Sequence, residues 1–93
     1  MIAYTVLRKI RLRPTHRPTG NTRHYHSNVE LPPAAVLTIA RYENETGYYL
    51  LYFDDNDQEM TDTYHDTLDD ALAQAEFEYG VRPDEWQLTH DNN

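Results

Sequence analysis

The segment Thr67-Leu-Asp-Asp-Ala-Leu-Ala-Gln-Ala-Glu-Phe-Glu-Tyr-Gly80 decides how this chain folds. It predicts a helix over residues 68–79, because Thr67 suits the N-cap, acidic residues follow in the first turn and Gly80 suits a left-handed C-cap. Five apolar residues fall on one stripe about 100° wide: Leu68, Ala71, Leu72, Ala75 and Tyr79. A stripe of this width packs against a sheet, so we expect the helix to cover one sheet face.

The opposite side of this helix carries an aromatic residue among acidic ones. Phe77 lies almost opposite the apolar stripe. Its neighbours on that side are Asp69, Asp70, Ala73 and Glu76. Two readings are open: Val81 and Trp86 fold back over Phe77, or Phe77 is a hydrophobic anchor inside an acidic rim, as at the centre of a binding hot spot. The second reading makes Asp69, Asp70, Ala73, Glu76 and Phe77 candidate partner-binding residues.

Four segments upstream of the helix predict strands. Residues 34–42 and 48–53 flank a glycine-containing turn, and residues 58–63 follow a second turn rich in Asp and Asn. Residues 2–12 alternate, with one side expected to hold Ile2, Tyr4, Val6, Ile10 and Leu12. The sequence therefore predicts an α+β fold, a mainly antiparallel sheet of about four strands with one helix packed on one face.

The predicted strand 48–53 is apolar on both sides, which is typical of a central strand whose two faces are covered. One helix covers only one face of a four-stranded sheet. Three candidates remain for covering the other: the segment 14–30, a second copy of the chain, or another partner. The length of 93 residues fits a single domain, residues 1–93, with the segment 14–30 as a basic loop or arm.

Charge is divided unevenly along the chain. Residues 1–41 hold seven cationic residues against Glu30 alone, a net of +6, whereas residues 42–93 hold fifteen acidic residues against Arg82 alone, a net of −14. Such asymmetry indicates either two oppositely charged surfaces or an internal match between a basic and an acidic segment. Repulsion by the acidic half weighs against a polyanionic partner.

The basic segment nevertheless supplies an alternative function, nucleic-acid or phosphate binding. Arginines could grip phosphates while a tyrosine stacks on a base. The residues concerned are Arg11, Arg13, Arg17, Arg23 and Tyr25.

Histidines supply a third alternative, a small metal-dependent or histidine-based enzyme. His24 and His26 lie on the same side of an extended chain, and His65 is close in sequence to Asp62 and Asp66. There is no cysteine and no nucleophile or phosphate-binding motif. We therefore expect no enzyme, no catalytic residue, no metal and no cofactor.

Three segments in the C-terminal half, with Ala71 and Trp86, carry a resemblance: Gly47-Tyr-Tyr-Leu-Leu-Tyr-Phe-Asp54, Thr61-Asp-Thr-Tyr-His-Asp-Thr-Leu68 and Gln74-Ala-Glu-Phe-Glu-Tyr79. In these segments the chain resembles a group of small uncharacterised bacterial proteins. The resemblance implies the order strand, strand, helix and a bacterial origin, and it brings no activity. In size and acidity the chain is also similar to small neutralising proteins, such as immunity partners of bacterial toxins and phage-encoded inhibitors.

Together these observations predict a small acidic protein-interaction module that neutralises or inhibits a basic protein partner. The apolar opening residues are too few to span a membrane and are followed by Arg8 and Lys9, so we expect a cytoplasmic protein without membrane contact. A homodimer is consistent with the uncovered sheet face.

Overall fold

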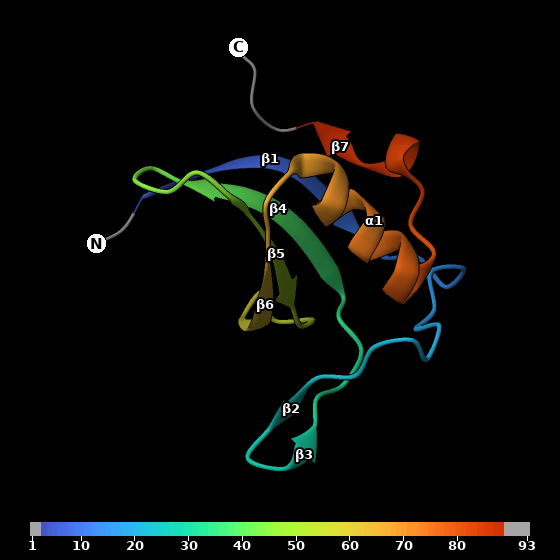
Figure 1. Cartoon of the computed structure of the whole chain (residues 1–93). Coiled ribbons are helices and arrows are strands. Elements are labelled where there is room, and N and C mark those ends of the chain that lie inside the picture. The colour runs from blue at the N-terminus through green and yellow to red at the C-terminus, as the bar shows by residue number, and fades with distance from the viewer. Residues whose placement is uncertain (1–2, 89–93) are drawn as a thin grey trace.

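Five strands form one antiparallel sheet in the order β6-β5-β4-β1-β7 (Figure 1). The computed structural model describes residues 3–88. The sheet strands are β1 (Tyr4–Arg11), β4 (Val36–Tyr42), β5 (Tyr48–Phe53), β6 (Glu59–His65) and β7 (Gln87–Leu88). The remaining elements are the hairpin strands β2 (Tyr25–His26) and β3 (Val29–Glu30), the helix α1 (Leu68–Tyr79) and a 3-10 turn, η1 (Pro83–Glu85).

Helix α1 begins and ends where the sequence predicts. The Thr67 hydroxyl accepts a hydrogen bond from the Asp70 backbone N–H at 3.0 Å, which supplies an N-terminal donor with a partner. Gly80 is left-handed, with φ of 70°, and its N–H donates to the Glu76 carbonyl at 2.9 Å. The α+β prediction is confirmed, with one helix packed on a mainly antiparallel sheet.

The hydrophobic core lies between α1 and one face of the sheet, here called the covered face. That face carries Ile10, Leu37, Ile39, Leu50 and Tyr52. The predicted helix stripe packs on it, and the C-terminal residues Val81 and Trp86 complete the same core. The prediction of an internal strand at residues 48–53 is also confirmed, since β5 lies between β4 and β6.

A β-bulge changes the alternation of β1. Val6 pairs with Ala40, but Arg8, two residues later, pairs with the next residue of β4, Ile39. Leu7 is therefore an extra residue, and the side chains on either side of it alternate out of phase. The predicted common face for Tyr4, Val6, Ile10 and Leu12 is wrong for this reason, and Ile2 lies outside the described residues. Ile10 and Leu12 pack in or against the core, whereas Tyr4 and Val6 lie on the other face.

The arm, residues 14–30, lies beside the C-terminal end of α1 (Figure 1). Thr19 N–H donates to the Glu78 carbonyl at 2.7 Å, and the Thr19 hydroxyl and the Asn21 amide donate to the Phe77 carbonyl. These bonds satisfy carbonyls that the last helical turn leaves without an intrahelical partner. The proposal that the arm covers the second sheet face is therefore wrong, because the arm lies on the helix side.

The fold has two features that the sequence analysis missed. β7 pairs with β1 through Arg8–Leu88 and Lys9–Gln87, which makes a fifth strand. Within the arm, β2 and β3 form a two-stranded hairpin that projects from the body of the molecule (Figure 1). Its turn residues Ser27 and Asn28 both have positive φ, at 52° and 68°, the geometry of a tight hairpin turn.

The face of the sheet opposite α1 is here called the open face. Side chains of the same strands bury the residues at its centre. Strand register and alternation place on it Tyr4, Val6, Lys9, Arg11, Val36, Thr38, Ala40, Tyr42, Tyr49, Leu51, Phe53, Glu59, Asp62 and Tyr64. Four tyrosine rings meet edge to face in a row across four strands, Tyr4–Tyr42–Tyr49–Tyr64, with centroids 4.9–5.4 Å apart. Ala40 and Leu51 on this face are fully buried, although α1 packs on the other side.

Candidate functional site

The outer surface of α1 presents the predicted aromatic anchor. Phe77 is 51% exposed. Val81 and Trp86 are buried in the core, so the reading in which they fold over Phe77 is wrong. Asp69, Asp70, Ala73 and Glu76 are all exposed on the same helix. The structure thus brings all five candidate partner-binding residues to one exposed helix surface, here called the acidic helix face.

A shallow hollow lies on this surface between α1 and the end of β6. It is lined by His65, Asp70, Ala73, Gln74 and Phe77. Burial lowers the pKa of His65, although nearby carboxylates act in the opposite direction. The imidazole is therefore mainly neutral at pH 7, and Asp70 gives the hollow its negative charge.

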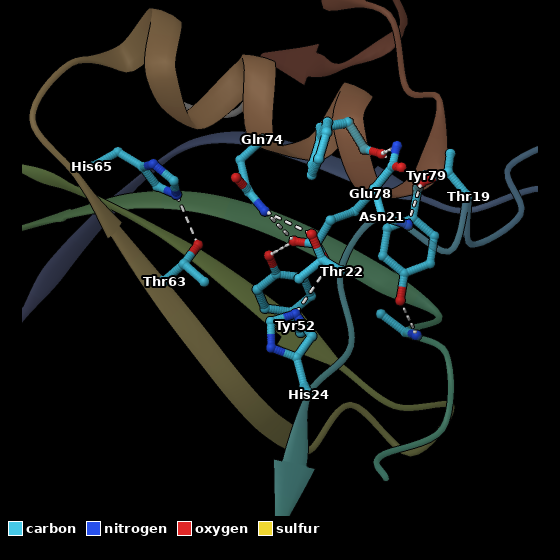
Figure 2. Close-up of polar contacts among 12 residues, drawn as sticks. Thr19, Asn21, Thr22, His24, Tyr52, Thr63, His65, Gln74, Glu78 and Tyr79 are labelled. Atoms are coloured by element: carbon cyan, nitrogen blue, oxygen red, sulfur yellow. Dashed lines mark hydrogen bonds and ion pairs between the residues drawn. The ribbon is translucent and has the colours of Figure 1, made fainter.

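The predicted pairing of His65 with Asp62 or Asp66 does not form. His65 Nε2 lies 2.7 Å from the Thr63 hydroxyl, two residues back on the same side of β6 (Figure 2). Asp62 points to the open face, because neighbouring residues of a strand alternate. A threonine hydroxyl gives the imidazole a hydrogen bond but no charge, so this site lacks the carboxylate that would orient a general base.

A polar cluster inside the covered face is centred on Glu78, which is 3% exposed (Figure 2). Its carboxylate is held by His24 Nε2 at 2.9 Å, by Gln74 Nε2 at 2.8 Å and by the Tyr52 hydroxyl. The His24 ring also packs on the Tyr52 ring, with centroids 4.6 Å apart. Burial, followed by the hydrogen bond to Glu78, raises the pKa of Tyr52, so the phenol remains a proton donor.

The sequence analysis did not select Glu78, because it follows Glu76 in an acidic run that is typical of a solvated helix face. A signal was nevertheless present. Glu78 is three residues after Ala75, which places it at the edge of the buried stripe. A buried carboxylate needs several donors, and three come from the arm, β5 and α1.

A second histidine–glutamate pair fixes the start of the arm. His16 is buried, and its Nε2 lies 3.1 Å from both Glu85 oxygens. The backbone N–H of Arg13 donates to His16 Nδ1 at 3.0 Å, so the ring proton is on Nε2 and points at Glu85. A backbone hydrogen bond from Arg82, followed by the one from His16, lowers the pKa of Glu85. The glutamate therefore stays ionised in mildly acidic solution.

These two pairs show how the basic and acidic halves of the chain meet. His16–Glu85 and His24–Glu78 are partly buried and join the halves across 54 or more residues. Among residues 3–88, the arginines of the basic half make only exposed pairs, Arg11–Asp57 at 3.9 Å and Arg23–Glu30 at 3.4 Å. Exposed pairs of this kind contribute little to stability. Histidines rather than arginines thus provide the internal match, and most of the opposing charge stays on the surface.

The candidate nucleic-acid residues do not gather at one place: Arg11 and Arg13 line a shallow pocket near the end of β1, whereas Arg17, Arg23 and Tyr25 lie along the arm. Tyr25 is 59% exposed on the projecting hairpin, next to the Arg23–Glu30 pair. Arg11 lies at the end of β1, on the open face. Among residues 3–88, Arg13 and Arg17 form no ion pair, and Arg17 Nε donates to the Pro14 carbonyl.

Comparison with protein families, with curated proteins and with solved structures finds no significant match to this chain. The resemblance to small bacterial proteins therefore stays a prediction. Within residues 3–88, no helix has the length and apolar character needed to cross a membrane.

In the described part of the chain, no group of three histidine or carboxylate side chains is arranged to hold a metal ion. His24 and His26 therefore lack a third ligand there. His24 is bound to Glu78, and His26 is exposed on β2. The Glu78 cluster therefore acts as a structural tie that fastens the arm to the sheet and helix. The acidic helix face combines an exposed aromatic side chain with exposed carboxylates.

Proposed function

We propose that this protein is a non-enzymatic protein-interaction module whose acidic helix face binds a basic protein, which it neutralises or inhibits. The observation that carries the proposal is the half-exposed Phe77 side chain among exposed carboxylates. An exposed aromatic ring surrounded by charge resembles the centre and rim of a protein–protein interface. The excess of −14 in residues 42–93 favours a cationic partner.

Charge and the aromatic ring have different parts in this proposal. The carboxylates Asp69, Asp70 and Glu76 attract a basic partner over a distance of about one Debye length, roughly 8 Å at physiological salt. Phe77 then loses its contact with water and slows dissociation of the complex. Neutralising the carboxylates should therefore mainly lower the association rate, whereas removing the ring should mainly raise the dissociation rate.

The arm supports this surface by fixing the backbone at Phe77. Thr19 Oγ1 donates to the Phe77 carbonyl at 2.5 Å and Asn21 Nδ2 donates to it at 3.0 Å. Gly80 ends the helix one turn later. A side chain on a fixed backbone loses less conformational entropy when it binds, so the anchor is held ready before the partner arrives.

The test compares four forms of the protein as affinity baits in a bacterial lysate: wild type, Phe77→Ala, the triple variant Asp69→Asn, Asp70→Asn, Glu76→Gln, and a control. The control neutralises three exposed acids elsewhere: Glu43→Gln, Asp55→Asn and Asp84→Asn. We expect a specific basic protein that wild type and control both retain and that the two site variants lose. Its binding to purified wild type is then measured at 50 and 200 mM salt.

Equal capture by wild type and both site variants would overturn the proposed surface. Capture that depends on nucleic acid and disappears after nuclease treatment would favour the alternative described next.

A second candidate function, nucleic-acid or phosphate binding through the arm, is favoured by one observation. The hairpin exposes Tyr25 next to Arg23, and Arg13 and Arg17, earlier in the chain, form no ion pair among residues 3–88. The test titrates a fluorescent single-stranded oligonucleotide against wild type and an Arg17→Ala, Arg23→Ala variant. Binding by the arm predicts steep weakening with salt and loss in the variant, since each phosphate contact releases counterions.

A further inference from the structure

The open face carries two rows of residues that run from a cation to a carboxylate. Strand register aligns Lys9 on β1, Thr38 on β4, Leu51 on β5 and Asp62 on β6 in one row. The next row holds Arg11, Val36, Phe53 and Glu59 in the same strand order. Each row is therefore basic on β1, uncharged over the two central strands and acidic on β6.

These charges are poorly matched within one chain. Lys9 forms no ion pair with any residue in the range 3–88, and Arg11 has only the exposed contact with Asp57 at 3.9 Å. At the other end of the rows, Glu59 and Asp62 lie side by side. Burial and the Asp62 carboxylate raise the pKa of Glu59, which is the effect of two like charges that lack a nearby cation.

Beside these two rows, towards the N-terminal end of β1, the open face carries the row of tyrosines. Tyr64 is 50% exposed and Tyr4 is 43% exposed, and their edge-to-face contacts join them through Tyr42 and Tyr49. Tyrosines are enriched at protein interfaces because a ring buries a large area while its hydroxyl remains hydrogen-bonded. The open face therefore combines a row of tyrosines with two rows that have opposite charges at their ends.

A two-fold axis parallel to the strands, between β4 and β5, would satisfy these charges. Rotation about it places the β1 side of one copy over the β6 side of the other while each row stays at the same height. Lys9 then meets the second copy's Asp62, and Arg11 meets its Glu59, twice in each dimer. Sheets that pack face to face in this aligned way are the usual arrangement of β-sandwiches.

We propose that two copies of this chain associate through their open faces, with Lys9–Asp62 and Arg11–Glu59 as the intermolecular ion pairs. A second copy fits better than an unrelated partner because a two-fold interface requires the same surface to be complementary to itself. The two rows meet that requirement. The dimer leaves the acidic helix face free, because α1 lies on the opposite side of the sheet.

The test uses charge reversals that separate self-association from any other role of these residues. Sedimentation velocity on wild type from about 1 μM to about 1 mM should show a concentration-dependent dimer. Lys9→Glu places two carboxylates against each other, and Asp62→Lys places two ammonium groups against each other. Each single reversal should weaken dimerisation by at least about 100-fold, because like charges facing each other in an interface repel strongly.

The decisive sample is an equimolar mixture of the two single variants. A Lys9→Glu chain meets an Asp62→Lys chain with opposite charges at both contacts, so the mixture should form a heterodimer although each component alone is monomeric. The double variant, Lys9→Glu with Asp62→Lys, should dimerise as wild type does. Arg11→Glu and Glu59→Lys repeat the same test on the second row.

Matched controls are Arg82→Glu and Asp84→Lys, which reverse exposed charges at the N-cap of η1 and within it and should leave dimerisation unchanged. Circular dichroism checks that every variant is folded. A wild type that stays monomeric over the whole range, single reversals that leave the dimer intact, or a mixture that fails to associate would each overturn the proposal.

Discussion

The two faces of the sheet are buried by different means. The covered face is mainly aliphatic, with Tyr52 among its residues, and lies beneath α1 and the C-terminal residues Val81 and Trp86. The open face has small residues and Leu51 at its centre, covered by tyrosines from the same strands. A helix forms a layer whose position is fixed by its own hydrogen bonds, whereas rings on a strand surface can turn about their side-chain torsions. Equal burial on the two faces therefore does not imply equal rigidity.

Leu50 and Leu51 give the most direct comparison, since both are 0% exposed and they point to opposite faces. Leu50→Ala should lower the free energy of unfolding by about 4 kcal/mol and Leu51→Ala by about 2 kcal/mol, because the cost depends on how far the surroundings close the cavity. Urea denaturation of the two variants measures both values. Equal loss of stability in the Leu51→Ala and Leu50→Ala variants would show that the tyrosine layer is as rigid as the helix.

The buried carboxylate on the covered face should be nearly as important. Glu78→Ala leaves His24, Gln74 and the Tyr52 hydroxyl without their shared acceptor, so we expect a loss of about 3 kcal/mol in the free energy of unfolding. Glu78→Gln, which keeps one acceptor oxygen, should cost less. Urea denaturation gives the stabilities, and limited proteolysis of the arm reports whether its anchor is lost. If both variants retain wild-type stability, the cluster is not a structural tie.

Gly47 tests how the outermost ring of the tyrosine row is seated. It is buried, and a Cβ at this position would overlap the ring and hydroxyl of Tyr64. Gly47→Ala should therefore displace that exposed ring, at a cost of about 1 kcal/mol, by disturbing its contact with Tyr49. In a double-mutant cycle the same substitution in a Tyr64→Ala background should cost much less. Additive effects would mean that the ring does not rest on Gly47.

Alkaline titration should show the smallest effect, and it concerns the same tyrosine row. The hydrogen bond from Tyr49 to Glu45, with partial burial, raises the pKa of Tyr49 to about 12. A raised pKa in the folded state means that this stabilisation is fully present below the unfolded value of about 10 and is lost as pH rises through the folded value. Glu45→Gln should shift tyrosinate absorbance at 295 nm to lower pH, and Tyr49→Phe should reduce the late component, to which Tyr52 also contributes. An unchanged curve in Glu45→Gln would exclude this cause.

Local signals made the covered face predictable. The bounds and caps of α1 follow from residues within four positions of each end, and β5 follows from its own apolar run. Features that depend on distant residues were missed. Glu78 meets His24 across 54 residues and His16 meets Glu85 across 69, and no local pattern encodes such pairs. The candidate helix surface was predicted because a helical wheel needs only local spacing, whereas the cover of the open face depends on the register of four strands.

The bulge at Leu7 has a consequence for how the length of β1 can change. Because Leu7 is one residue more than the pleat requires, a chain without it would keep Tyr4 and Val6 on the open face and Ile10 on the covered face. Removal of one residue elsewhere in the strand would shift one part of it by a step and exchange its two sides. Position 7 is therefore the place in β1 where deletion of one residue would leave the side chains before and after it on their present faces of the sheet.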